Sequence, residues 1–407
     1  MTLTPVPSAG TTAEELRHAM VDQLRADGTI RSERVANAFL EVPRHAFAPE
    51  VSLAEAYEPV QALVTKRDEN GLAVSSVSAA QIQALMLEQA DVKLGMRVEE
   101  IGSGGYNAAL IAELVGPAGE VVTVDIDPFV TDRAAKFLDA AGYSRVSVML
   151  ADGSEPVEGG LFDRIIVTVG AWDLPQAWTD RLAEGGTITV PLRMRGLTRS
   201  ITFRRDGDRL VSVSAKVCGF VKMQGVSAHD EFLVLPRGTK EIGLRFDELD
   251  RPDTSGLAGV LETARVERWT EVTVGNQEPF DSLYLWLAGV LPGFGLLSVN
   301  SELDTKTVVP ANKLACPVIV DGGSLAYLAL RKIAEDPVRF EFGAHGFGPD
   351  GDHLVALITE QVEVWTREHR AGDGPTFTAY PAGTPDDQLP DGPVIDKRDV
   401  RILISWP

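Results

Sequence analysis

Three acidic residues stand at the ends of apolar runs that are predicted strands. Glu100 lies near the end of RVEEI, Asp125 ends EVVTVD, and Asp152 closely follows VSVML. A glycine-rich turn, 102–105 (GSGG), directly follows the first run. Ligands of open α/β sheets bind at the carboxyl ends of the strands, and glycine lets a ligand approach the main chain. The three acids therefore predict one ligand site on three consecutive strands.

The glycine turn is compatible with three kinds of nucleotide ligand. A P-loop requires GxxxxGK[ST], and no lysine follows these glycines, so phosphoryl transfer is disfavoured. A dinucleotide fold requires G-x-G-x-x-G, but Asn107 stands at the third glycine position, so that match is partial. S-adenosylmethionine is the third candidate. It carries an ammonium and a sulfonium but no pyrophosphate, and a set of three carboxylates suits such a cationic ligand.

Each acid has an expected role in that site. Asp125 is placed to accept hydrogen bonds from both ribose hydroxyls, Asp152 to accept one from the adenine amino group, and Glu100 to face the methionine-bearing end. For any one of them alone, a helix cap or a turn residue is the commoner role. It is the set of three at strand ends that favours the ligand site.

The surrounding sequence predicts the elements that position these acids. From about residue 90 to 225 it alternates strand, glycine turn and helix, as in RVEEIGSG, AALIAELVG and EVVTVDID. This alternation predicts right-handed βαβ units and a doubly wound, mostly parallel sheet of the Rossmann-like α/β class. After it, Asp206-Gly207 predicts a hairpin.

The length of 407 residues exceeds what one hydrophobic core usually serves, so two domains are expected. Residues 1–89 are assigned to an N-terminal helical segment and a substrate-side loop, residues 90–225 to the cofactor-binding core, and residues 226–407 to a second α/β or α+β domain. Residues 1–10 form a Pro/Ser/Gly tail, and 371–393 is expected to be a loop before a last strand. A capping box at Thr12 and Glu15 predicts a helix that ends at Asp27-Gly28.

Charge and composition restrict the partners. Lys and Arg total 38 against 59 Asp and Glu, a net charge of −21, which argues against nucleic acid and against an anionic membrane surface. Small molecules or peptides are favoured instead. The two cysteines, Cys218 and Cys316, predict neither a disulfide framework nor a thiolate zinc site, and they favour a reducing, cytoplasmic location. The N-terminus lacks the basic and apolar regions of a signal peptide, and no run of 18 apolar residues occurs.

The first half of the chain, from about residue 14 to 225, resembles the protein-L-isoaspartate (D-aspartate) O-methyltransferases. The resemblance rests on the order and spacing of several motifs: 42–50 (VPRHAFAPE), 56–57 (AY), 100–107 (EIGSGGYN), 151–153 (ADG), 162–171 (FDRIIVTVGA) and 182–186 (LAEGG). It implies a carboxyl O-methyltransferase that uses S-adenosylmethionine. The implied cofactor contacts, beside the three acids, are Gly102, Ser103, Gly104, Tyr106, Ile126 and Gly153.

The substrate-side segment of that family, T-I-S-A-P-H-M-x-A, is similar to residues 76–84 (SVSAAQIQA). The resemblance implies substrate contacts by Ser76 and Val77, and a catalytic position for Ser78. The two serines could also cap the helix QIQALMLEQA, and the two roles are compatible. Ala80-Gln81 replaces the Pro-His of the pattern, which puts isoaspartate recognition in question. The glycine turn is one residue shorter than G-T-G-S-G-Y, which changes the loop over the methionine moiety but keeps the strand, the acid and the helix.

The added second half and the SSVSA variant look like a branch that accompanies ribosomally made peptides such as lanthipeptides and graspetides. The implied substrate is an ordinary Asp in a modified or cyclised precursor peptide, methylated on the way to aspartimide or isoaspartate. The second domain is then expected to recognise the peptide or to form a homo-oligomer interface. Two alternatives stay open: isoaspartate repair in damaged proteins, and a peptide-binding module with a relict cofactor fold.

Carboxylate methylation agrees with the scattered histidines. A carboxylate with a pKa near 4 is ionised at neutral pH, so no general base is required. The six histidines form no Ser-His-Asp or HExxH set. Residues 345–353 (HGFGPDGDH) include possible metal ligands, but their spacing matches neither zinc nor EF-hand patterns. A solvated loop without metal is expected there.

Overall fold

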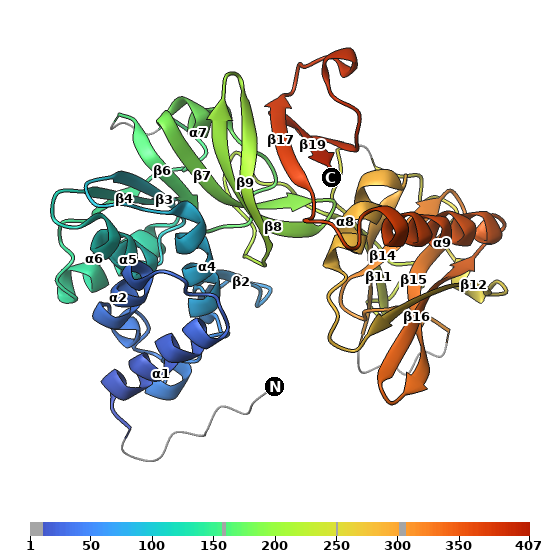
Figure 1. Cartoon of the computed structure of the whole chain (residues 1–407), viewed down its shortest axis with the longest axis horizontal. Helices are drawn as coiled ribbons and strands as arrows, with labels where there is room; N and C mark the ends of the chain where they lie inside the picture. The colour runs from blue at the N-terminus through green and yellow to red at the C-terminus, as the bar shows by residue number, and fades with distance from the viewer. Residues whose placement is uncertain (1–10, 157–159, 250, 301–306) are drawn as a thin grey trace. The chain divides into compact units, whose positions relative to one another are not determined.

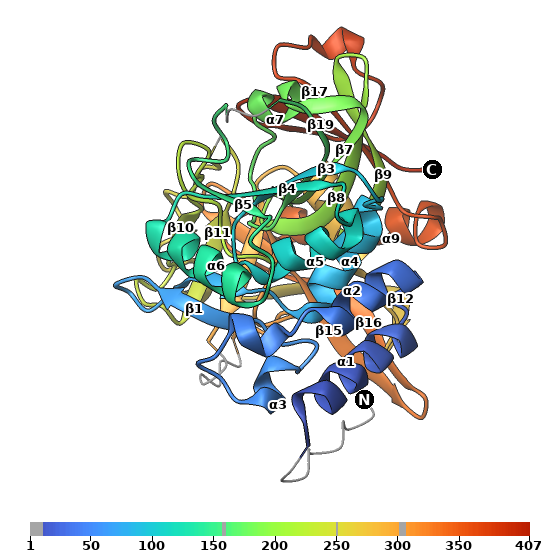
Figure 2. The same ribbon diagram turned by 90° about the vertical axis from the view of Figure 1, so that its left-hand side faces the viewer.

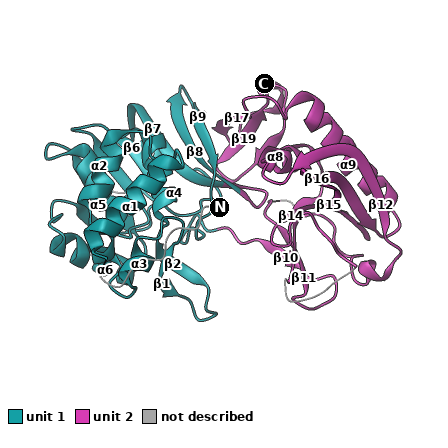
Figure 3. Ribbon diagram, turned by 60° about the horizontal axis from the view of Figure 1, so that its bottom comes forward, with its two compact units in different colours: residues 1–192, 198–228 teal, residues 193–197, 229–407 magenta. Residues whose placement is uncertain are grey.

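The computed structural model describes residues 11–156, 160–249, 251–300 and 307–407. The predicted tail 1–10 therefore lies outside the described residues. The chain forms two compact units (Figure 3). The first comprises residues 1–192 and 198–228, and the second comprises residues 193–197 and 229–407. Each unit has its own helices.

Within the larger sheet, the strands β3 to β9 of the first unit follow the order β9-β8-β7-β6-β3-β4-β5. The neighbours β7-β6, β6-β3, β3-β4 and β4-β5 run parallel, whereas β8 and β9 are antiparallel. This confirms the doubly wound, mostly parallel sheet. The strands are β3 (Arg97–Ile101), β4 (Glu120–Asp125), β5 (Ser147–Leu150), β6 (Phe162–Val167), β7 (Leu182–Met194), β8 (Leu197–Asp206) and β9 (Arg209–Val217).

Helices cover this sheet on both faces. In Figure 2, α4, α5 and α6 lie on one side of β3–β5 and α7 lies on the other. Further out, α2 packs on α5, and α1 packs on α2 (Figure 1). Leu110 and Ile111 of α5 and Phe39 of α2 are fully buried between these layers. The helices are α1 (Ala13–Ala26), α2 (Glu33–Glu41), α3 (Leu53–Ala56), α4 (Ala80–Ala90), α5 (Tyr106–Val115), α6 (Pro128–Ala140) and α7 (Gln176–Asp180), with a 3-10 turn η1 (Arg44–Phe47).

Two local predictions in the first unit are confirmed. Helix α1 begins after Thr12, whose side chain and that of Glu15 form the capping box, and it ends at Asp27. Strands β8 and β9 pair up to Asp206 and Arg209, with Gly207 at φ +67° in the turn between them. Another hairpin, β1 (Leu63–Arg67) and β2 (Ala73–Val77), precedes α4, and its strands were not predicted.

The second unit contains a fully antiparallel seven-stranded sheet with the order β10-β11-β13-β14-β15-β16-β12. Helix α9 packs on β12, β15 and β16, and α8 packs on β13, β14 and α9. The expected second domain is thus of the α+β kind. Its elements are β10 (Phe232–Val234), β11 (Ile242–Phe246), η2 (Val260–Glu262), β12 (Val266–Gly275), α8 (Asp281–Val290), β13 (Phe294–Val299), β14 (Cys316–Asp321), β15 (Ser324–Glu335), β16 (Val338–Phe347) and α9 (Gly351–Glu368).

The turn between β7 and β8 belongs to this second unit. Arg193 forms a buried ion pair with Asp247 at 2.7 Å, and Arg195 pairs with Glu248 at 2.6 Å. The Gly196 N–H also donates to Asp247 at 3.1 Å. Residues 193–197 are therefore part of the second unit, although they join β7 to β8 in the chain.

The expected loop at 371–393 was wrong in part. Strand β17 (Thr376–Pro381) pairs with β19 (Val400–Ser405), which in turn pairs with β18 (Val394–Asp396). A 3-10 turn, η3, spans Asp386–Gln388. Phe377 and Ala379 alternate as buried residues of β17. That period of two, in the run TFTAYP, favours a strand despite the surrounding Pro, Gly and Asp.

The expected solvated loop at 345–353 was also wrong. His345 is buried in β16, and His353 lies within α9. Across the described ranges, no three His, Cys, Asp or Glu side chains gather as a metal ion would require. Cys218 and Cys316 are free thiols. Among the helices that the structure describes, none is both long and apolar enough to cross a membrane.

Candidate functional site

Two adjoining cavities lie at the carboxyl ends of β3, β4 and β5, both within the first unit. They share Val74, Gly102, Asp125 and Val169 in their walls. The first is also lined by residues 75–78, the rest of the glycine turn to Gly104, and by Glu100, Tyr106, Asn107 and others. The second is also lined by Ile126, Asp152, Gly153 and residues 222–224. All twelve site residues expected from the sequence therefore line one cavity or both.

The glycine turn has a backbone that other residues would strain. Gly102 has φ +98°, and a Cβ built there would lie 2.6 Å from the Thr168 hydroxyl oxygen. That hydroxyl donates to the Gly102 carbonyl at 2.6 Å, which fixes the turn against β6. A Cβ on Gly104 would lie 3.6 Å from the Ser76 carbonyl. Glycine at 102 is thus required by its positive φ and by the close approach of Thr168, whereas the approach of a ligand to this turn stays a prediction.

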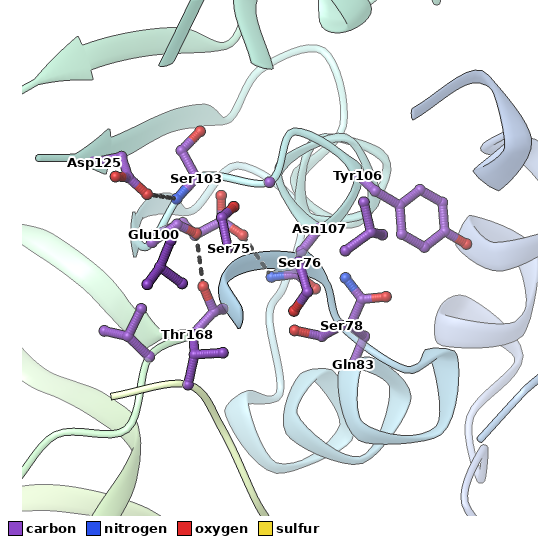
Figure 4. Close-up of a pocket in the computed structure, with 16 residues that line it drawn as sticks. Ser75, Ser76, Ser78, Gln83, Glu100, Ser103, Tyr106, Asn107, Asp125 and Thr168 are labelled. Carbon is purple, nitrogen blue, oxygen red and sulfur yellow. Dashed lines mark hydrogen bonds between the residues drawn. The ribbon is translucent and has the colours of Figure 1, made fainter. Parts of the chain in front are cut away.

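Glu100 is fully buried in the floor of the first cavity. One oxygen accepts a hydrogen bond from the Asn107 amide at 2.8 Å (Figure 4). The other accepts one from the Thr123 hydroxyl at 2.5 Å. Burial raises the pKa of Glu100 to about 7, although both hydrogen bonds favour the carboxylate. A cation in the cavity would restore the charged form, which agrees with the predicted ligand.

Asp125 braces the glycine turn and still faces both cavities. It accepts hydrogen bonds from the backbone N–H groups of Ser103 and Asp127, each at 2.9 Å. Burial raises the pKa of Asp125, and these two bonds oppose the shift. Each carboxylate oxygen has two lone pairs, so one acceptor position per oxygen is left for a ligand hydroxyl.

Asp152 holds a segment that closes the second cavity. It accepts hydrogen bonds from the Ser154 N–H and hydroxyl, at 2.9 and 2.6 Å, and from the Val226 N–H at 2.8 Å. Burial alone would raise the pKa of Asp152, but these bonds outweigh it and hold the pKa below its usual value. Gly225 has φ +85°, and a Cβ there would collide with the Asp152 carboxylate. Asp152 is therefore a loop anchor as well as a cavity residue.

The serines of the substrate-side segment line the first cavity and do not cap α4. The N-cap of α4 is Ala79, and no side chain caps this helix. Figure 4 shows Ser76 and Ser78 around the same hollow as Glu100 and Asn107. The alternative that the two serines cap the helix is therefore wrong, and both residues line the first cavity.

Tyr106 takes a different position from the one expected of a cofactor contact. It is fully buried, and Figure 4 shows its ring directed away from the hollow. The ring packs against Phe39 and Phe47, with centroids 6.2 and 5.7 Å apart. Burial raises the pKa of the Tyr106 hydroxyl. Tyr106 therefore supports the first turn of α5 from behind.

Several cavity residues were missed from the sequence. Asn107 had a signal, because it departs from the third glycine of a dinucleotide motif, and here its amide holds Glu100. The segment 222–224 had none. It is fixed by backbone hydrogen bonds between Gly170 and both Val221 and Met223. The other missed residues are Val74, Ser75, Gln83, Ile101, Val124, Asp127, Val130, Thr168, Val169 and Val221.

The side chains that line the two cavities suit a cationic nucleoside ligand. Glu100 and Asp125 line the first cavity, where the ligand's positive charges would lie, and Asp125 and Asp152 line the second. Neither cavity is lined by an arginine, which a pyrophosphate would favour. The parallel sheet, the glycine turn and the strand-end acids together define the Rossmann-like class of S-adenosylmethionine-dependent methyltransferases.

Comparison with known proteins identifies the family. The family model described as protein-L-isoaspartate(D-aspartate) O-methyltransferase matches residues 14–227. The chain belongs to this family, and it is an S-adenosylmethionine-dependent protein (iso)aspartate O-methyltransferase.

Named relatives agree with this assignment. Protein-L-isoaspartate O-methyltransferase of Hyperthermus butylicus is 37% identical over 223 residues, which is 52% of this chain and 89% of that protein. The protein of the same name from Methanopyrus kandleri is 39% identical over 180 residues, which is 43% of this chain and 76% of that protein. A solved structure, also named protein-L-isoaspartate O-methyltransferase, aligns with a TM-score of 0.51 and 20% identity over 96% of this chain and 99% of its own. That likeness in fold extends into the second unit.

Proposed function

We propose that the protein methylates the free carboxylate of isoaspartyl residues in proteins or peptides. The observation that carries the proposal is that residues 75–78 and the cofactor-side acids line the same cavity. An acceptor held by the substrate-side segment would therefore lie next to the methyl donor. The names of the relatives favour isoaspartate as that acceptor. This order differs from the expectation drawn from the sequence, which ranked an ordinary Asp in a maturing peptide first.

The chain has to orient reactants and needs no proton transfer. S-adenosylmethionine supplies an electrophilic methyl group on a sulfonium. An oxygen of the acceptor carboxylate forms the new bond to the methyl carbon, and the carbon–sulfur bond breaks with its electron pair on sulfur. The acceptor is already ionised at neutral pH. Ser78 would hold the acceptor in line, and alignment of this kind can supply most of the rate enhancement.

The direct test compares two peptides that differ in one linkage. A peptide with one isoaspartyl residue and its normal aspartyl counterpart are each incubated with the enzyme and labelled cofactor, and the methyl ester is counted. The proposal predicts turnover of the isoaspartyl peptide alone. If neither peptide is methylated, the proposal is contradicted.

A second candidate is methylation of an ordinary Asp in a modified or cyclised precursor peptide, leading to aspartimide or isoaspartate. The observation that favours it is Ala80-Gln81 in place of the Pro-His of the family pattern. Ala80 is fully buried at the start of α4, and the Gln81 N–H donates to the Pro59 carbonyl at 2.9 Å. No imidazole is supplied at these two positions. Turnover of one cognate precursor peptide, with little on generic isoaspartyl peptides, would put this candidate first.

We also propose that the second unit selects the substrate. It carries no recognised motif for chemistry, yet it has a cavity of its own, lined by Phe280, Tyr284, Glu278 and neighbouring residues. Contacts remote from the reacting group can discriminate between substrates. Tyr284→Ala is therefore expected to raise KM for a long substrate and to leave KM for a short peptide unchanged. Unchanged KM values for both would instead favour a role in self-association.

A further inference from the structure

A fully buried arginine organises the substrate side of the first cavity. The guanidinium of Arg44 donates from Nε to the Ala56 carbonyl at 2.8 Å, from Nη1 to Gln83 Oε1 at 2.9 Å, and from Nη2 to the Ser78 carbonyl at 2.7 Å. It also lies over the ring of Tyr106, 5.0 Å from its centroid. One side chain therefore fixes both Ser78 and Gln83, which line the cavity.

The charge of Arg44 is not neutralised by an acid. In the part of the chain that the structure describes, no carboxylate forms an ion pair with it, and its three partners are neutral oxygens. A guanidinium stays protonated in proteins, so this site contains a buried positive charge. Such a charge is costly unless an anion approaches it. Arg44 does not itself line the cavity, but its positive charge lies behind Ser78 and Gln83, whereas the acids Glu100 and Asp125 lie on the cofactor side.

Arg44 also determines which way the Gln83 amide points. A guanidinium has donors and no acceptor, so the atom of Gln83 that faces it must be the oxygen. The amide nitrogen then points away from Arg44. No described residue accepts a hydrogen bond from it, although Gln83 is only 5% exposed. Figure 4 shows this amide in the hollow beside Ser78. The cavity thus presents two adjacent donors, one hydroxyl and one amide.

We infer that Gln83 binds the acceptor carboxylate beside Ser78, with Arg44 as the positioning residue that orients the Gln83 amide and attracts the anion. The inference rests on the proposed methylation of a carboxylate. One acceptor oxygen forms the bond to the methyl carbon while donors hold the other. Glu100 and Asp125 would repel that carboxylate, so the Gln83 side of the cavity is where it is stable.

The decisive variant is Gln83→Glu. Its carboxylate still accepts from Arg44, so the support of residues around Arg44 is kept, but the amide donor becomes an anionic oxygen. We expect kcat/KM for the acceptor to fall by at least about 100-fold, because a hydrogen-bond donor is lost and the new carboxylate repels the acceptor carboxylate. Gln83→Met removes the donor without adding charge and should lower kcat/KM by about 10-fold, mostly through KM. Gln61→Glu adds the same charge at an exposed position outside the cavity and serves as the control.

Two measurements separate binding from mere support. S-adenosylhomocysteine affinity by calorimetry and the thermal midpoint should both be retained in Gln83→Glu. If Gln83 only braces Arg44, Gln83→Glu would keep the wild-type kcat/KM, and that result would overturn the inference. Absence of turnover by the wild-type enzyme on every carboxylate peptide would instead contradict the proposed function. Arg44→Lys should raise KM for the acceptor more than it lowers kcat, as expected for a positioning residue, and the reverse pattern would contradict its assignment.

Discussion

The two units bury ionisable groups in different settings. In the first, Glu100 is buried at a strand end beside a glycine turn and a cavity, and burial raises its pKa to about 7. In the second, His345 is buried within β16, and burial lowers its pKa to about 4. The Tyr327 hydroxyl lies 3.2 Å from His345 Nδ1, and the Trp269 ring packs against the imidazole edge to face.

A shifted pKa alone therefore does not mark a functional site. His345 and Tyr327 lie on neighbouring strands, paired across the sheet at one register position. Neither residue lines a described cavity, and the Tyr327 hydroxyl accepts from the Val309 N–H at 3.1 Å. Glu100 differs because it lines a cavity beside the glycine turn, where the missing side chains give a ligand access to it. The comparison predicts large effects on activity in the first unit and effects on stability alone around His345.

The largest effect is expected for Ser78→Ala. It should lower methyl transfer by at least about 100-fold while most cofactor affinity is kept, because acceptor alignment is lost and the cofactor side is untouched. Initial rates with a peptide acceptor and calorimetry with S-adenosylhomocysteine measure the two quantities. Ser144→Ala, at an exposed position outside the cavities, is the matched control. Wild-type turnover by Ser78→Ala would remove Ser78 from the site.

Asp125→Ala is expected to weaken cofactor affinity by about 10- to 150-fold, the usual effect of losing a charge-assisted hydrogen bond worth about 1.5–3 kcal/mol. The structure adds a second cause, because Asp125 also holds the Ser103 and Asp127 N–H groups. Asp125→Asn should show a smaller loss, since its one oxygen can still accept. Asp132→Ala, exposed on α6, controls for the lost charge. Unchanged calorimetric affinity in Asp125→Ala would exclude the predicted ribose contact.

The cofactor side of the candidate site could be predicted from the sequence because the residues that indicate it lie close together in the chain. Strand-end acids and glycine turns occur within a few residues of each other, and parallel pairing of β3, β4 and β5 then brings Glu100, Asp125 and Asp152 to one edge. The positions of Gln83 and Arg44 could not be read in this way. Their contact spans 39 residues and depends on how η1 packs against α4.

The misassigned elements have the same physical origin. His345 is followed by glycines at 346 and 348, which suggests a loop, yet pairing with both β12 and β15 makes its segment part of an interior strand. Residues 376–381 are flanked by turn formers, and only pairing with β19 shows why Phe377 and Ala379 alternate. Tertiary pairing decides such segments, and a sequence window does not contain the partner strand.

Glu100 predicts opposite pH trends for stability and for cofactor binding. Because its pKa in the folded state, about 7, exceeds the ordinary value, the folded protein keeps a proton that the unfolded chain releases. Its contribution to stability is therefore fully present below about pH 4.5 and is lost as pH rises through 7, by up to roughly 3 kcal/mol. A cationic cofactor prefers the carboxylate, so affinity should rise over the same range by up to about 10-fold per pH unit.

Calorimetry with S-adenosylmethionine between pH 5.5 and 7.5, in two buffers of different ionisation enthalpy, measures the proton released on binding. Glu100→Gln should abolish both the release and the pH dependence. Identical proton release by the variant and the wild-type protein would show that another group titrates.

The smallest effect on activity is expected at Tyr327. This residue tests the second half of the comparison, namely that the buried groups around His345 affect stability alone. Tyr327→Phe removes a hydroxyl that accepts from the Val309 N–H and contacts His345, so it should cost about 1–2 kcal/mol of unfolding free energy. Because the hydroxyl lies in the second unit and outside the cavities of the first, kcat/KM for a short peptide should be unchanged. Urea denaturation followed by fluorescence gives the stability, and the transition that shifts should be that of the second unit.

The remaining His345 still has a lowered pKa, so stability should fall in wild-type and variant alike as pH drops from about 6.5 through 4. A loss of kcat/KM that matches Ser78→Ala, with stability intact, would mean that the His345 cluster takes part in the reaction and that the contrast between the two units is wrong.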